Sequence, residues 1–124
     1  MTNAESTQKV TLSSRGGATP YRAITLAATG LIVKATAGTL FSIASHNLNA
    51  AVRYLKLYDK ATAATETDTP KFTIPLPTGQ LQPITFPAGV SFVNGIGIRC
   101  VTELADNGTT GATASETIVN LTYK

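Results

Sequence analysis

Short strand-like runs follow one another from residue 21 almost to the end of this chain. Each run is bounded by Gly, Asn, Pro or Thr, and none shows the spacing of apolar residues that a helix requires. Strand and turn signals repeated at intervals of about ten residues predict a β-sandwich or barrel. The runs are Tyr21–Ala27, Leu31–Ala35, Thr39–Asn47, Val52–Asp59, Phe72–Leu76, Leu81–Phe86, Val90–Val93, Ile96–Leu104 and Glu116–Tyr123.

These runs and the short turns between them predict an all-β fold, an antiparallel jelly-roll-like β-sandwich of about eight strands. Large side chains on both sides of Val52–Asp59 predict a central strand covered on both faces, with the polar tips of Tyr54, Lys56 and Tyr58 in water. Pro75 should lie on an edge strand, because proline cannot donate to a ladder. Pro87-Ala88-Gly89 reads as a turn between two strands.

The length of 124 residues allows one hydrophobic core. Residues 1–20 are polar and rich in Ser and Thr, so we expect an extended N-terminal arm there and a sandwich domain over 21–124. Two further segments lack large apolar residues over most of their length and should be exposed loops, Lys60–Pro70 and Asp106–Ser115.

The formal net charge is +3, and the ten Lys and Arg never form a block of three. A nucleic-acid site would cluster them among aromatic residues, so we expect no nucleic-acid partner. No run approaches the roughly 20 apolar residues of a membrane span, and we expect no membrane partner. Cys100 is the only cysteine, which excludes an intrachain disulfide and fits synthesis in a reducing cytoplasm.

No catalytic, cofactor-binding or metal-binding constellation emerges from the residues. His46, the only histidine, has only Ser42 and Ser45 nearby as nucleophiles, without a nucleophile-elbow motif, so we read it as a turn residue. Cys100 alternates with apolar residues and should pack in the core. Asp106-Asn107-Gly108 lacks the other ligands of a calcium loop. We therefore expect neither an enzyme nor a cofactor, although carboxylates distant in sequence can still meet in space.

Four segments carry a resemblance to a known family: GLIVKATAGTLF, AAVRYLKLYDKATA, DTPKFTIPLPTG and ITFPAGVSFVNGIGI, in that order between Gly30 and Ile98. Their most distinctive pieces are Arg53–Tyr58, Asp68-Thr69-Pro70 and Ile74-Pro75. Together they resemble a family of small tailed-phage virion proteins, of the capsid-decoration or cement type. Thr117–Tyr123 adds a weaker similarity, and residues 1–29 lie outside it.

The resemblance implies a virion structural protein, made in the host cytoplasm, that binds the outer surface of a capsid. Its partner would be the major capsid protein, and copies would form a homo-oligomer, with three-fold clustering favoured. We assign capsid contact to the arm, Thr2–Thr19, and partner-facing or exposed positions to Lys60–Pro70 and Asp106–Ser115. Two alternatives stay open: a head-fibre, neck or tail component of the virion, and a glycan-binding β-sandwich module.

Overall fold

The computed structural model describes residues 17–124, and this part of the chain forms eight strands and no helix. The all-β class predicted from the spacing of the runs is thereby confirmed. The strands are β1 (Thr19–Ala23), β2 (Leu31–Lys34), β3 (Gly38–Asn47), β4 (Arg53–Asp59), β5 (Phe72–Leu76), β6 (Leu81–Phe92), β7 (Ile96–Val101) and β8 (Thr117–Tyr123).

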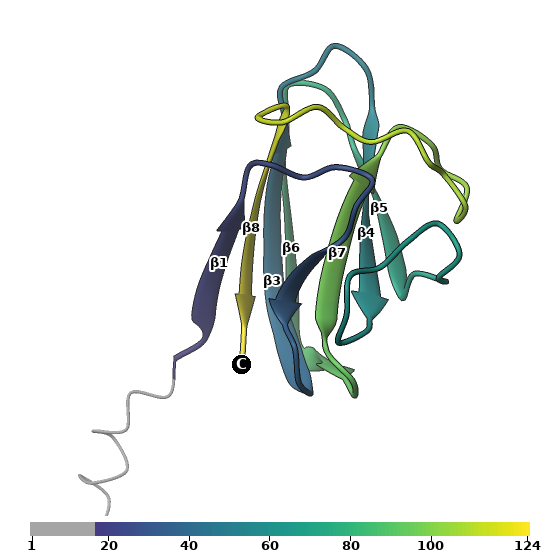
Figure 1. Cartoon of the computed structure of the whole chain (residues 1–124). Helices are drawn as coiled ribbons and strands as arrows, with labels where there is room; N and C mark the ends of the chain where they lie inside the picture. Colours follow the sequence, from purple (N-terminus) through teal and green to yellow (C-terminus); the bar gives the residue numbers. More distant parts are fainter. Residues whose placement is uncertain (1–16) are drawn as a thin grey trace, which may run out of the picture.

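The strands form two four-stranded sheets, ordered β1-β8-β3-β6 and β2-β7-β4-β5, and all neighbouring strands are antiparallel. Four of the pairings are nested: β1 with β8, β2 with β7, β3 with β6, and β4 with β5. A long antiparallel ribbon rolled into two facing sheets gives this order, which is the jelly roll. Figure 1 shows the two sheets and the connections between them.

The connections gather at the two ends of the sandwich (Figure 1). One end, here called the loop end, carries residues 24–30, 48–52, 77–80 and 102–116. The other, called the terminal end, carries residues 35–37, 60–71 and 93–95, the start of β1 and the C-terminus. Residues N-terminal to β1 therefore join the domain at the terminal end.

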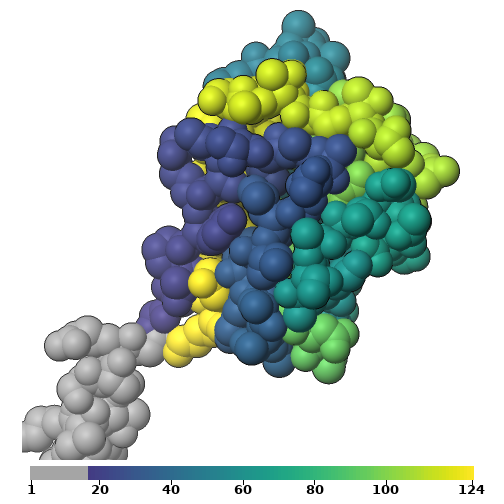
Figure 2. Space-filling view, in the orientation of Figure 1, coloured from purple at the N-terminus to yellow at the C-terminus, as the bar shows by residue number. Residues whose placement is uncertain are grey.

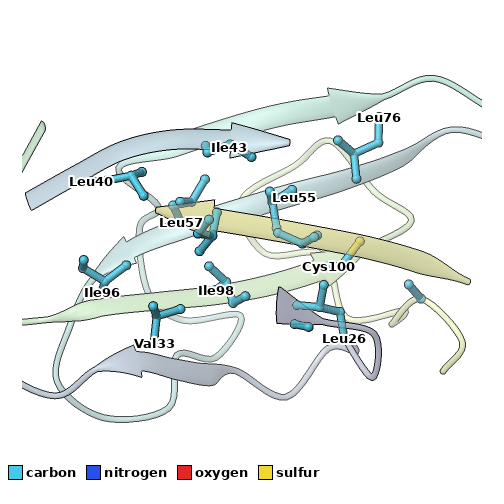
Figure 3. Close-up of a cluster of buried hydrophobic side chains, with 14 of the residues drawn as sticks. Leu26, Val33, Leu40, Ile43, Leu55, Leu57, Leu76, Ile96, Ile98 and Cys100 are labelled. Atoms are coloured by element: carbon cyan, nitrogen blue, oxygen red, sulfur yellow. The ribbon is translucent and has the colours of Figure 1, made fainter. Parts of the chain in front are cut away.

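The core lies between the sheets and is built by alternation along the strands. Leu55 and Leu57 of β4 face Ile43 and Leu40 of β3, and all four are almost fully buried. Leu26, which precedes β2, closes the core from the loop end (Figure 3). Cys100 is also fully buried, as its alternation with apolar residues predicts.

One predicted turn is wrong. Leu81–Phe86 and residues 90–92 belong to a single strand, β6, because Pro87-Ala88-Gly89 is a bulge within it, and Val93 follows the end of the strand. Ser42 of β3 pairs with Thr85, while Leu40 pairs with Val90, so β6 carries more residues than β3 over this stretch. Gly89 has φ +79° and lies against Phe41, a conformation and an approach that a side chain would prevent.

A second bulge, in β3 itself, corrects a predicted face of that strand. Alternation places Phe41 with Ile43 and sets Leu40 on the opposite side. In the structure both Leu40 and Ile43 face the core, because β3 advances by two residues between Leu40 and Ser42 while β8 advances by one, from Tyr123 to Thr122. Phe41 is therefore an inserted residue, and the insertion restores the apolar side chains to one face.

Strand β1 begins at Thr19, within the segment assigned to the arm, because Thr19 and Pro20 pair with Tyr123 and Thr122. It ends at Ala23, earlier than Tyr21–Ala27 predicts, since the chain then crosses toward the second sheet. The rest of the predicted arm, up to residue 16, lies outside the described residues. β4 is central, between β5 and β7, and Pro75 lies on the edge strand β5, as predicted.

We expect Leu55→Ala and Ile98→Ala each to lower the free energy of unfolding by about 2–5 kcal/mol, because both side chains are fully buried between the sheets. Leu104→Ala is the control at a side chain that is 62% exposed, and should change it by less than ~0.5 kcal/mol. Urea unfolding followed by fluorescence or circular dichroism measures all three. Equal losses at core and control positions would contradict this assignment of the core.

Candidate interaction surfaces

The outer face of the sheet β2-β7-β4-β5 is covered by the protein's own loops. Lys56 and Tyr58 of β4 and Arg99 of β7 point away from the core, on the opposite side of their strands from Leu55, Leu57 and Ile98. All three are nevertheless buried, because residues 24–30 and 102–112 fold over them. The segment 60–71 lies against β2 on this side, where Gly30 N donates to Ala64 O at 3.1 Å (Figure 2).

Arg99 holds two of these segments in place. Its Nε donates to Ala28 O at 2.5 Å, and its two terminal nitrogens donate to Tyr58 Oη at 2.9 Å and Gly108 O at 2.8 Å. The guanidinium also lies over the Tyr58 ring, 5.9 Å from its centre. Only a planar fork with several donors can reach acceptors in three directions at once. Arg99 thus fastens both loops to the sheet.

Lys56 is the neighbour of Arg99 across the β4–β7 pairing and donates from Nζ to Ala105 O. Burial lowers the pKa of Lys56 below its ordinary value of 10.5, while the nearby Asp106 acts in the opposite direction. The prediction that the Lys56 ammonium group lies in water is therefore wrong, and it is wrong for the Tyr58 hydroxyl as well, which is buried against Arg99. The loop 102–116 covers it, which alternation within β4 cannot reveal.

At the loop end the Glu116 carboxylate joins two connections and strand β4. Glu116 accepts from Arg53 Nε at 2.8 Å and from the Thr113 N–H at 3.1 Å, and Asn49 Nδ2 donates to it as well. Hydrogen bonding from Arg53 lowers the pKa of Glu116 below 4.5, and burial acts against it.

A second set of bonds adds the loop 77–80. Asn47, fully buried beside Glu116, donates to Ala51 O and Leu76 O, and its carbonyl accepts from Gly79 N at 2.8 Å. The loops 48–52, 77–80 and 102–116 are thereby tied together.

A shallow hollow of about 380 Å³ opens beside this network. Ser115, one of its lining residues, has φ +65°, which is uncommon for a residue other than glycine. The Glu116 carboxylate already accepts four hydrogen bonds from Arg53, Asn49 and Thr113. The hydrogen-bonding capacity of this carboxylate is therefore used to hold the loops together. The hollow is lined by Leu48, Asn49, Thr113, Ala114, Ser115 and Glu116.

Within residues 17–124, no connection forms a hydrogen bond across the outer face of the other sheet, β1-β8-β3-β6, in contrast to the loops over Lys56 and Arg99. Three rows of side chains make up this face, called here the open face: Ile118, His46 and Leu81; Arg22, Asn120, Ala44 and Pro83; Pro20, Thr122, Ser42 and Thr85. One formal cation and no carboxylate occur in these rows.

Charged side chains are distributed unevenly between the two ends. Lys34, Lys71 and Lys124 lie at the terminal end together with one exposed carboxylate, Glu66. Glu103, which accepts from the Thr110 N–H, and Asp106 lie at the loop end. Asp59 is also at the terminal end, but its carboxylate accepts from the backbone N–H groups of residues 93–95. Burial raises the pKa of Asp59, yet these N–H groups outweigh it and hold that pKa below 3.8. Asp68 is paired with Lys60 at 2.7 Å. The terminal end therefore presents cations that have no such pairing on the described part of the chain.

The candidate catalytic residues do not converge. His46 lies on the open face between Ile118 and Leu81, Ser42 Oγ is hydrogen-bonded to Thr122 Oγ1, and Ser45 is fully buried in the core. Burial raises the pKa of the Cys100 thiol to about 11, which keeps it protonated and inert. Within residues 17–124 no three His, Cys, Asp or Glu side chains are grouped to hold a metal ion, and no helix is suited to cross a membrane.

Sequence reasoning missed Arg99 and the Arg53–Glu116 pair. A cation between two core-facing residues, as Arg99 is between Ile98 and Cys100, signals an outward position in a central strand. Whether a loop covers that position is decided by tertiary structure. No known protein-family model matches the chain, and no curated protein matches its sequence.

Arg99→Lys should lower the free energy of unfolding by more than ~1 kcal/mol, because an ammonium group cannot reach Ala28 O, Tyr58 Oη and Gly108 O together. Amide hydrogen exchange within residues 102–112 should become faster. Lys124→Arg, the converse exchange at an exposed position, serves as control and should leave both measurements unchanged. Native exchange rates in the Arg99→Lys protein would show that the guanidinium does not hold this loop.

Glu116→Gln should flatten the dependence of stability on pH. The ionised Glu116 has a pKa below its ordinary 4.5 in the folded protein, so its contribution is complete above pH ~4.5 and is lost as the pH falls through the folded value. The variant should be less stable than the native protein at pH 7, and the gap should narrow toward pH 3. The urea concentration at the midpoint of unfolding, determined for both proteins between pH 3 and pH 7, measures this difference in stability. Arg53→Met should give the same narrowing, and a constant gap in both variants would count against the pair.

Proposed function

We propose that this protein is a structural component of a tailed-phage virion that binds the outer surface of the capsid as a decoration or cement protein. The resemblance between Gly30 and Ile98 supports the virion assignment. The jelly-roll fold supports a role through surfaces, because its two sheets leave rigid faces and ends available for contact. In this proposal the protein carries out no reaction and uses no cofactor.

The observation that carries the proposal is the polarity of the domain. The terminal end presents Lys34, Lys71 and Lys124 against one exposed carboxylate, Glu66, and strand β1 begins at this same end. Basic groups favour contact with an acidic protein surface and speed the encounter with it. We therefore assign the terminal end, together with the segment Thr2–Thr19, to the major capsid protein, and direct the loop end outward.

The mechanism is thermodynamic linkage, in which binding of this protein favours the assembled state of the shell. A protein that binds only across a junction between capsomers stabilises the joined state by its binding free energy. A specific contact buries about 800 Å² per partner, which is within reach of one end of a small domain with its adjoining segment. Repetition over many junctions makes a modest contact sufficient to raise the resistance of the particle.

The hollow at the loop end supports a second candidate, a glycan-binding module. Asn49, Thr113 and Ser115 are the polar groups that a sugar hydroxyl could meet there, and Leu48 is an exposed apolar neighbour. In a virion protein this hollow would face away from the shell. The two functions therefore use opposite ends and do not compete.

Attachment should fail when the charge of the terminal end is reversed. The triple variant Lys34→Glu, Lys71→Glu, Lys124→Glu should bind particles at least tenfold more weakly than the native protein, and native binding should weaken as salt is raised. Co-sedimentation with particles stripped of this protein measures binding, and cryo-EM locates it. A protein without residues 1–18 keeps all eight strands and should also bind weakly.

The matched control places three glutamates at the loop end, Thr109→Glu, Thr113→Glu and Ala114→Glu, all at exposed positions. It should decorate particles normally. Decorated particles should also survive heat or chelation better than bare ones. Equal survival would remove the cement role, density only at a neck, tail or fibre would favour the alternative location, and equal binding by the two triple variants would refute the assignment of the terminal end.

A further inference from the structure

We propose that Asn107 is a site of spontaneous covalent modification, at which the Gly108 nitrogen closes a ring on the Asn107 side chain and thereby releases residues 102–112 from Arg99. The inference concerns the loop end and does not depend on attachment to a particle. The chain contains a second pair of the same kind, Asn94-Gly95. Asparagine before glycine is prone to this reaction, because glycine has no Cβ to keep its nitrogen away from the preceding side chain. The structure places the two pairs in opposite surroundings.

The reaction needs water and no other reagent. The Gly108 amide gives its proton to solvent, and its nitrogen attacks Cγ of Asn107. A bond forms between this nitrogen and Cγ, the bond from Cγ to Nδ2 breaks, and Nδ2 leaves as ammonia with a proton from water. Water then opens the succinimide ring at either carbonyl. The product is aspartate or isoaspartate, and in isoaspartate the main chain runs through the former side chain and is one carbon longer.

The turn at Asn107 leaves the reacting atoms accessible. Asn107 is exposed, and Gly108 N donates to Ala105 O at 3.1 Å. Lys56 Nζ donates to the same Ala105 oxygen. An ammonium group is the stronger donor, so the shared oxygen holds the Gly108 N–H less firmly than an ordinary turn does. A Cβ on residue 108 would lie 2.9 Å from the Cβ of Glu103, so the packing of Glu103 favours glycine here and with it the reactive pair.

The charges around this turn favour the attacking form of the nitrogen. That form is the Gly108 amide after loss of its proton, and a nearby cation stabilises an anion. Lys56 and Arg99 are buried beneath the turn, and Arg99 donates to Gly108 O at 2.8 Å. The carboxylates of Glu103 and Asp106 act in the opposite direction. Both residues are more exposed than the two cations, so water and salt screen their charges more strongly.

Asn94-Gly95 has the contrary arrangement. The Asp59 carboxylate accepts from Asn94 N at 2.7 Å and from Gly95 N at 3.4 Å. Burial raises the pKa of Asp59, but the backbone N–H groups hold it below 3.8, so Asp59 is ionised at neutral pH and opposes a negative charge on the Gly95 nitrogen. A Cβ on Gly95 would lie 2.7 Å from both Lys34 O and Lys60 O. The close packing of this turn leaves little room for ring closure.

Modification should loosen the cover over the sheet β2-β7-β4-β5. Gly108 O is one of three acceptors of the Arg99 guanidinium. An isoaspartate at position 107 lengthens the main chain just before Gly108 and moves this oxygen from its place in the turn. Leu104, the largest apolar side chain of residues 102–112, is 62% exposed, so apolar packing does little to hold the loop instead. The modified loop therefore gains a negative charge and loses an anchor.

Peptide mapping of the folded protein, kept warm at neutral pH for several weeks, tests the site. The change from amide to carboxyl raises the mass of a peptide, and electron-transfer fragmentation separates aspartate from isoaspartate. In the native fold Asn107 should react about tenfold faster than Asn94, or more, because the charges beside the two nitrogens have opposite signs. In urea the two rates should converge. Lys56→Met, checked for folding by circular dichroism, should slow the reaction at Asn107 and leave that at Asn94 unchanged.

Amide hydrogen exchange of the purified isoaspartate form tests the effect on the loop. Exchange within residues 102–112 should be faster than in the native protein. Asn107→Asp adds the charge without the longer main chain, and as the matched control it should exchange as the native protein does. Equal rates at Asn107 and Asn94 in the folded protein would overturn the site. A native rate in Lys56→Met would overturn the role of the buried cation, and native exchange in the isoaspartate form would overturn the release of the loop.

Discussion

The buried guanidinium of Arg99 determines which side of the sandwich is left for contact. Its donors reach the backbone of two separate connections, and those connections then cover the sheet to which it belongs. A buried cation without a carboxylate partner is costly unless its donors are satisfied. Here carbonyl oxygens and the Tyr58 hydroxyl satisfy them, so the loops cannot move away without exposing or orphaning these groups. Within the part of the chain that the structure describes, the outer face of the opposite sheet has no comparable buried cation and no loop hydrogen-bonded across it.

Three surfaces of different character result. Within residues 17–124, the terminal end carries three unpaired lysines and one exposed carboxylate, the loop end carries Glu103, Asp106 and the hollow, and the three rows of the open face contain one charged residue, Arg22. A contact for an acidic shell and an outward tip can therefore exist on one small domain without overlap. The Arg53–Glu116 pair keeps the loop end rigid, since it joins connections from both sheets. Each role proposed for the protein uses one of these surfaces.

The fold could be predicted from the sequence because the local strand and turn signals agree with the final arrangement of the strands. Alternation with Leu55 and Leu57 inward identified β4, and Pro75 correctly marked an edge strand. The failures have specific causes. Pro87-Ala88-Gly89 has the composition of a turn, but a bulge places the same demands on the backbone. Lys56 and Arg99 alternate as exposed residues should, and only the long connection 102–116, distant in sequence from Lys56, buries them. Neither the open face nor the difference in charge between the two ends can be predicted from the sequence before the order of the strands is known.

The nested pairing also governs when the protein can fold. Among the described residues β1 pairs with β8 alone, so the first strand of the domain can pair only after the last has been synthesised. Until Thr117–Tyr123 is present, β3 has an unpaired edge in the middle of what will become the open-face sheet. Contacts so distant in sequence make folding slow, typically milliseconds to seconds. A nascent or truncated chain without β8 therefore exposes an unpaired edge of β3 to other chains. Rapid synthesis of the C-terminus shortens this exposure and so limits aggregation.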